Sequence, residues 1–369
     1  MVGLLLGGVL LGPYAFGIVS PESHSVDLFA SVGRVFLMFI AGLEIDMRVF
    51  QATRGRSMGF GATTFLMPLL GGIAVAWSFD FNWLAAVLVG SLLASHTLLG
   101  FPVVSRLGLN KSEPVAVTVG ATIFTDIASL LVLAICISIH KGGFSPIGIA
   151  VQLAQLAVYG VIVLQGLPVL GRHYFRRHRQ DEQTLFVFTF LTVMVAAVGA
   201  HYIHLEDIVG AFLAGIAVNR LLERSSVREK VLLLGEGLFV PLFFITIGVK
   251  LNLPVFAATL VNSLGFVVAI VAALFIGKFL AAAAARWFYG YDWPAPLTMW
   301  SLSLPQVAAT LAAAIAAYEA VNDYGDRLIT ESVLNAVIVL MVLTAVLGPV
   351  LTERFARRMT TEEKTDATA

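Results

Sequence analysis

The chain has little charge and almost no cysteine. Charged residues make up 12% of its 369 residues, about half of the roughly 25% found in soluble domains. Cys136 is the only cysteine, which excludes a disulfide framework and a cysteine-ligated metal site. Basic residues balance acidic ones and are scattered over loops, unlike the basic patch of a nucleic-acid-binding protein. With 59% hydrophobic residues, the composition indicates an all-α polytopic protein in a lipid bilayer.

Apolar runs of about 20 residues predict the membrane spans. The twelve expected spans lie near 2–19, 28–46, 58–79, 82–105, 115–139, 145–170, 184–203, 207–221, 231–249, 256–285, 294–318 and 331–352. Most of the 23 basic residues fall in the loops after even-numbered spans, as expected if those loops are cytoplasmic. We therefore expect a multi-pass protein of the cell (inner) membrane, with a transmembrane domain over 1–353 and a short cytoplasmic tail over 354–369.

Two ionisable residues lie deep within predicted spans. Asp126 interrupts the apolar run 115–139, and Lys278 is the only lysine well inside any span. Charge in hydrocarbon is costly, so such residues usually mark ion or substrate pathways. The pair therefore suggests an ion pathway, although a buried structural ion pair is the alternative interpretation.

Two spans, the fourth and the eleventh, are interrupted by polar residues and proline. The residues concerned are Ser95, His96 and Thr97 in the fourth span and Ser303, Pro305 and Gln306 in the eleventh. Proline disfavours helix at the preceding residue, and broken helices at membrane depth offer dipoles and free carbonyl groups to ions. Because the breaks lie in opposite halves of the chain, we expect an inverted repeat whose broken helices cross near Asp126.

The neutral polar residues near this crossing permit two interpretations. Thr125, Ser95, Thr97 and Ser303 are candidate oxygen ligands for a hard monovalent cation. Ser95, Thr97 and Ser303 could equally be hydroxyl residues that hold membrane helices together. His96 fits a hydrogen-bonded core residue better than a proton relay, and Gln306 is similarly ambiguous.

Five short stretches, taken in the order in which they occur along the chain, resemble motifs of a known family. They are Leu6-Gly-Gly-Val-Leu-Leu-Gly-Pro13, Phe39-Ile-Ala-Gly-Leu-Glu-Ile-Asp46, Val209-Gly-Ala-Phe-Leu-Ala-Gly215, Pro241-Leu-Phe-Phe-Ile-Thr-Ile-Gly248 and Leu347-Gly-Pro349. In this order they resemble the membrane domain of the cation:proton antiporter superfamily, the Kef-like sodium–proton exchangers. The resemblance runs almost from end to end.

The resemblance implies a thirteen-span fold with a mobile core and a dimerisation domain. By this likeness the chain lacks the family's first span and forms a homodimer. The family's ion-binding aspartate falls on Asp126, preceded by Thr125, and its membrane lysine falls on Lys278. Thr125, His96 and the stretch Leu304-Pro-Gln306 depart from the family pattern.

The expected function is exchange of Na⁺ or K⁺ for protons by alternating access. A carboxyl group shielded from water can hold a proton near neutral pH, so proton and cation are expected to compete for Asp126, while Lys278 compensates charge. This describes a secondary active transporter, not an enzyme, with no cofactor or metal. The alternatives are a sodium-coupled organic anion symporter of similar fold and a cation channel, which would need a continuous polar pore.

Overall fold

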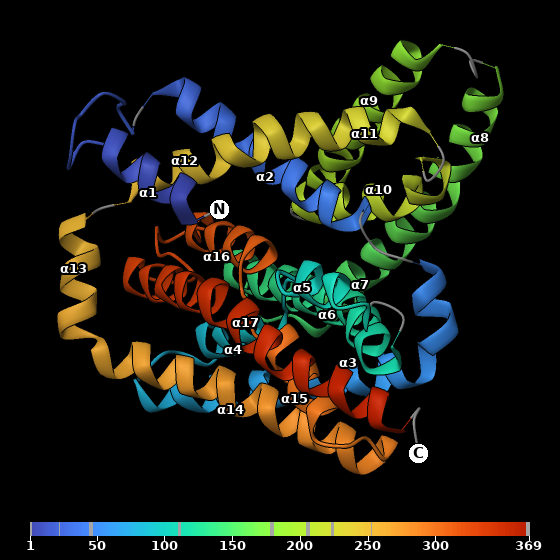
Figure 1. The fold of residues 1–369 in the computed structure, drawn as a ribbon. Coiled ribbons are helices and arrows are strands. Elements are labelled where there is room, and N and C mark those ends of the chain that lie inside the picture. Colours follow the sequence, from blue (N-terminus) through green and yellow to red (C-terminus); the bar gives the residue numbers. More distant parts are fainter. Residues whose placement is uncertain are drawn as a thin grey trace. The chain divides into compact units, whose positions relative to one another are not determined.

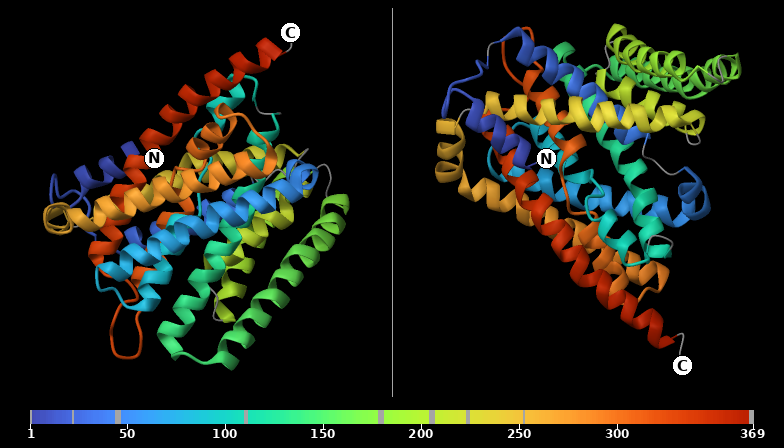
Figure 2. Two further views of the ribbon diagram at one scale, coloured as in Figure 1. Left: turned by 90° about the horizontal axis from the view of Figure 1, so that it is seen from below. Right: turned by 45° about the horizontal axis from the view of Figure 1, so that its top comes forward.

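The computed structural model describes residues 2–21, 23–43, 47–109, 112–177, 181–203, 207–222, 225–251 and 253–366, and within these ranges every regular element is helical. Eight helical stretches there are long and apolar enough to cross a membrane, and three shorter apolar helices accompany them. An isolated antiparallel bridge joins Val321 to Arg327 in the hairpin loop seen in Figure 2 (left). The expectation of a multi-pass, all-helical membrane protein is confirmed at this level.

Several helices differ from the expected spans, among them the first and the tenth. The first, α1 (Val2–Leu11), ends well before residue 19, because Gly12 and Pro13 follow it and proline disfavours helix at the residue before it. The tenth expected span is divided at Ser263 into α13 (Leu253–Asn262) and α14 (Leu264–Tyr289). The chain folds into two compact units, 1–45 with 143–256 and 46–142 with 257–369.

The first unit is held together by close backbone contacts at glycine. Besides α1 it contains α2 (His24–Leu43), α7 (Pro146–Val161), η2 (Ile162–Gly166), α8 (Leu167–Arg177), α9 (Glu182–Tyr202), α10 (Asp207–Leu222), α11 (Ser226–Leu234), η3 (Gly235–Phe239) and α12 (Val240–Lys250). A Cβ on Gly8 would lie 2.0 Å from the carbonyl oxygen of Ile245, and one on Gly42 would lie 2.2 Å from that of Phe212. Small residues therefore set the α1–α12 and α2–α10 packing, as is common between membrane helices.

The second unit is built from two sets of helices that share one order. The first set is α3 (Met47–Ser78), α4 (Trp83–Ala94), α5 (Phe101–Arg106) and α6 (Glu113–Gly142); the second is α14, α15 (Pro294–Leu302), α16 (Ala308–Glu319) and α17 (Glu331–Asp366). In each set an interrupted helix follows one long helix and precedes another (Figure 1). The last helix, α17, is 36 residues long, contains Pro349 and passes through the expected end of the membrane domain at residue 353 (Figure 2).

A polar cluster ties the two sets together at one end of this unit. Arg56 of α3 pairs with Glu113 at the start of α6, and the Tyr291 hydroxyl, just beyond α14, donates to Glu113 at 2.9 Å. Burial raises the pKa of Tyr291 to about 12. This phenol therefore keeps its proton well into the alkaline range and remains a donor there.

Candidate functional site

The two helix interruptions contact each other in the second unit. The α4 helix stops at Ala94, where Ser95 adopts an extended conformation, and α15 stops at Leu302. The Thr97 amide donates to the carbonyl of Pro305 at 2.8 Å. The Gln306 side-chain amide donates to the carbonyl of Ser95, which is 211 positions away in sequence. Residues from opposite halves of the chain thus meet at the breaks.

Lys278 caps the end of α4. Its ammonium group is fully buried and donates to the carbonyl oxygens of Thr64 (3.1 Å), Ala94 (2.7 Å) and Ser95 (3.3 Å). The last carbonyls of a helix lack partners and carry partial negative charge, so a group with three N–H donors suits this position. In the described part of the chain, Lys278 and Asp126 form no ion pair within 4.0 Å. Lys278 thus contacts a helix end directly, and its expected role in charge compensation stays a prediction.

Asp126 of α6 borders a small enclosed cavity. The cavity measures about 10 Å³, roughly the space one water molecule needs. Its polar lining comes from Ser91, Ser95, Asp126, Ser129 and Thr310, and its apolar lining from Leu88, Leu92, Leu130, Leu133, Ala309 and Ala313. Asp126 Oδ1 is buried and has no hydrogen-bond partner among the described residues. Because buried polar atoms are nearly always paired, such an oxygen suits a site that a proton or cation occupies in turn.

The hydroxyl groups around the cavity are organised by hydrogen bonds. Ser91 and Ser129 each donate to the other's carbonyl oxygen, at 3.3 and 3.2 Å, and so join α4 to α6. Thr310 donates to the side-chain oxygen of Gln306 at 2.6 Å and lies 3.1 Å from the Ser95 hydroxyl. A hydroxyl that donates one bond still has lone pairs to offer, so these oxygens remain able to face a cation.

Thr125 and His96 lie together outside the cavity lining. The Thr125 hydroxyl donates to the Thr122 carbonyl at 3.0 Å and lies 3.3 Å from His96 Nδ1. The Thr122 hydroxyl lies 3.0 Å from His96 Nε2. Both ring nitrogens therefore face hydroxyl groups, which can donate or accept by rotation. This pair of partners can satisfy the imidazole in either protonation state.

Three of the remaining predicted residues form hydrogen bonds through their backbone or within their own helix end. Ser303 donates to the carbonyl of Trp300 at 2.9 Å, within its own helix end. Thr97 and Pro305 share the backbone bond across the breaks. No group of three or more His, Cys, Asp or Glu side chains suited to a metal ion occurs in the searched, described residues.

Three hydroxyl residues of the cavity lining were not predicted from the sequence: Ser91, Ser129 and Thr310. Their spacing from the predicted site residues could have indicated two of them. Ser129 follows Asp126 by three positions, and Ser91 precedes Ser95 by four. Residues three or four apart share a helix face, so the faces that carry the expected site residues also carry these hydroxyls.

Comparison with known proteins places the chain in a family. A family model described as sodium/hydrogen exchanger, transmembrane, matches residues 1–357. The chain belongs to this family. The resemblance stated from the sequence motifs is thereby confirmed, and membership of a transporter family supports the expectation that the protein is not an enzyme.

Relatives in this family are named as antiporters. The chain is 54% identical over 359 residues to the Na(+)/H(+) antiporter NhaS5 of Synechocystis sp., a match covering 97% of this chain and 51% of that protein. It thus spans about half the length of that relative. It is 24% identical to the Na(+)/H(+)-K(+) antiporter GerN of Bacillus cereus, over 95% of this chain and 88% of the relative.

A solved structure shares the fold. It is the sodium proton antiporter MjNhaP1 of Methanocaldococcus jannaschii at pH 8, with a TM-score of 0.66 at 16% identity. The match covers 96% of this chain and 90% of that one. At this identity the likeness concerns the fold alone.

Proposed function

We propose that this exchanger-family member is a monovalent cation:proton antiporter whose exchange site is the cavity beside Asp126. The observation that carries the proposal is the unpartnered Asp126 carboxylate oxygen in a cavity of about 10 Å³. Buried carboxylates in membranes are rare and usually serve proton or ion pathways. The names of the relatives support the same class of transport.

Proton and cation compete for this carboxylate. The cavity has room for about one water-sized particle. A cation that gives up its water shell there needs the negative charge of the carboxylate, and a protonated Asp126 offers only neutral oxygens. A cation beside the ionised carboxylate replaces the proton and gains neutral oxygen ligands from the surrounding hydroxyls. Exchange is then close to one for one, with Lys278 retaining its bonds to the α4 carbonyls.

The size of the cavity favours Na⁺ over K⁺. A cation there meets a carboxylate oxygen and the hydroxyls of Ser95, Ser129 and Thr310, and a smaller ion needs less space and fewer ligands. A larger potassium ion would need the lining of the cavity to move apart. We therefore expect sodium as the preferred ion, with potassium transported weakly.

Alternating access fits the two sets of helices in the second unit. Each set places its interrupted helix between two long ones, the order that an inverted repeat would produce. In the transport cycle the cavity opens to one side of the membrane at a time, and the enclosed state described above lies between these openings. A homodimer in the inner membrane with a cytoplasmic carboxyl end remains the prediction from the resemblance and the loop charges.

The test is proton flux in proteoliposomes containing the full-length protein. Adding sodium to one side should drive protons the other way, and Asp126→Asn should abolish this flux. The matched control is Asp323→Asn, which removes an exposed carboxylate from the loop before α17 and should leave the flux unchanged. Flux that persists in Asp126→Asn would refute the assignment. Sodium-driven anion uptake without proton movement would favour the symporter, and uncoupled cation current would favour the channel.

A further inference from the structure

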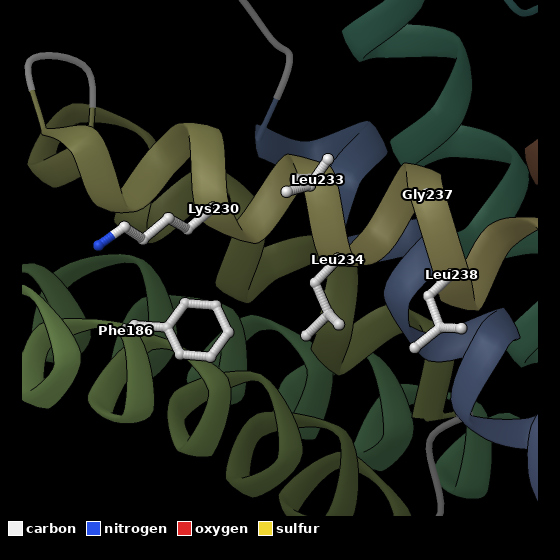
Figure 3. A pocket seen from close by; sticks show the side chains of 6 residues that line it. All are labelled: Phe186, Lys230, Leu233, Leu234, Gly237 and Leu238. Carbon is white, nitrogen blue, oxygen red and sulfur yellow. The ribbon is translucent and has the colours of Figure 1, made fainter.

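An open apolar groove lies in the first unit, away from the Asp126 cavity in sequence. It runs between α9 and the α11–η3 stretch and has a volume of about 470 Å³. The lining residues are Phe186, Lys230, Leu233, Leu234, Gly237 and Leu238. Figure 3 shows Phe186 rising from α9 toward the leucines, with Lys230 extending at one end. The groove is therefore apolar along its length and cationic at that end.

Gly237 keeps the groove open. An added Cβ at this position would meet only the Leu233 side chain, at 4.0 Å, so the space above it is free. Leu233 is 74% exposed and Leu238 is 45% exposed. In a membrane-spanning stretch such as Ser226–Lys250, surfaces of this kind face lipid chains.

The cationic end of the groove carries a neighbouring negative charge. Lys230 pairs with Glu182, and Ser226 also donates to Glu182. Both charged side chains are about half exposed. Glu182 begins one candidate span and Ser226 begins another, so the pair lies where two spans start. That is the depth at which lipid headgroups meet a membrane protein.

We propose that the groove binds one phospholipid with a zwitterionic headgroup bearing a primary amine, of the phosphatidylethanolamine type. The phosphate accepts hydrogen bonds from Lys230, and the ammonium donates to Glu182. One acyl chain lies along Leu234 and Leu238 over Gly237; the path from Lys230 to Leu238 is about 12 Å at 1.5 Å per helical residue.

The paired charges select this headgroup over others. A net-anionic headgroup would place negative charge beside Glu182 without an ammonium to offset it. A choline headgroup carries positive charge but no N–H donor, so it cannot form the charge-assisted hydrogen bond that an ammonium makes with a carboxylate. The adjacent Lys230 and Glu182 complement a headgroup with one phosphate and one primary ammonium.

Native mass spectrometry of the detergent-purified, delipidated protein tests this inference. Phosphatidylethanolamine, phosphatidylcholine and phosphatidylglycerol with identical acyl chains are titrated separately. The protein should bind phosphatidylethanolamine at least about fivefold more tightly than the other two, the factor that a hydrogen bond of ordinary net strength contributes. Glu182→Gln should remove the preference, because it removes the acceptor charge.

Gly237→Leu provides a second variant that fills the groove. It should reduce phosphatidylethanolamine binding about as strongly, whereas Gly166→Leu, at another glycine of this unit with open space around it, should not. Equal binding of the three lipids, tighter binding of phosphatidylglycerol, or unchanged binding in Gly237→Leu would each overturn the proposal. A loss of dimer in Gly237→Leu with lipid binding intact would also overturn it, in favour of a second copy in the groove.

Discussion

The two broken helices of the second unit end in different ways. At the end of α4, the carbonyls of Leu93, Ala94 and Ser95 accept hydrogen bonds from Lys278 and Gln306, which lie in the other half of the chain. At the end of α15, the last carbonyls accept from residues directly after them, including the amide and hydroxyl of Ser303.

This difference separates a break held by tertiary structure from one held by local structure. The α15 end needs only neighbouring residues of the sequence, because a tight last turn satisfies its carbonyl groups. The α4 end depends on two distant side chains to satisfy carbonyl groups in a buried site, and Ser95 at this end also borders the Asp126 cavity. We infer that changes at the α4 cap disturb both stability and exchange, whereas changes at the α15 end disturb neither strongly.

Replacing Lys278 should have the largest effect, because it removes the distant side chain that caps α4. Lys278→Met fills similar volume but leaves the carbonyls of Thr64 and Ala94 without their donor, at a cost of about 1–3 kcal/mol for each unsatisfied group. Thermal unfolding in detergent should show a large fall in Tm, and exchange should be lost. Lys250→Met, which removes a cation paired with Asp27 in the first unit, should hardly move Tm. An unaltered Tm in Lys278→Met would show that the cap does not stabilise the break.

Gln306→Leu should have the next largest effect. It removes the donor to Leu93 and Ser95 and the acceptor for Thr310, which costs about 1–3 kcal/mol at a buried site. Thermal unfolding should detect the loss, and the maximal exchange rate should fall because the cap next to the cavity is incomplete. A Gln306→Leu protein with the wild-type rate would uncouple the α4 end from transport.

Thr310→Val tests whether the hydroxyls beside the α4 end bind the cation. The substitution keeps the shape of the side chain but removes a hydroxyl that faces Ser95 and lines the cavity. We expect the KM for sodium to rise several-fold, and the fold to lose about 1–3 kcal/mol because the buried side-chain oxygen of Gln306 loses its donor. Thr298→Val is the matched control, since its buried hydroxyl bonds only the Pro294 carbonyl within α15. Equal changes in both variants would remove Thr310 from the cation ligands.

Ser303→Ala should have the smallest effect. Its hydroxyl bond to Trp300 is local, and the backbone amide of Ser303 still bonds Met299 and Trp300. The free energy of unfolding should fall by at most about 0.5–1.5 kcal/mol, the usual net contribution of one hydrogen bond. The exchange rate should be unchanged. A slower rate in Ser303→Ala at normal stability would place this residue in the transport site and contradict the local reading of the α15 end.

The positions of the breaks could be predicted because their causes are local. Polar residues and Pro305 interrupt apolar runs, and α4 and α15 stop within a few residues of them. The family could also be predicted, since its motifs are contiguous. The early end of α1 was predictable in principle from Gly12 and Pro13, but the apolar run hid it.

The partners of the site residues could not be predicted because packing chooses them. The sequence pairs Asp126 with Lys278 by charge, yet the lysine bonds carbonyls of α3 and of the α4 end. Thr125 adjoins Asp126 in sequence, yet its hydroxyl faces His96. A helix turns by about 100° per residue, so neighbours in sequence point to different faces, and only the folded arrangement shows which hydroxyls line the cavity.

Competition between a proton and a cation at Asp126 is the central claim. Calorimetric titration of the purified protein with NaCl, in buffers of different ionisation enthalpy and at a pH where Asp126 is protonated, counts the protons released per sodium bound. The account predicts release of close to one proton per sodium in the wild-type protein, and no sodium-linked release in Asp126→Asn. Sodium binding without proton release, or release that persists in Asp126→Asn, would contradict it.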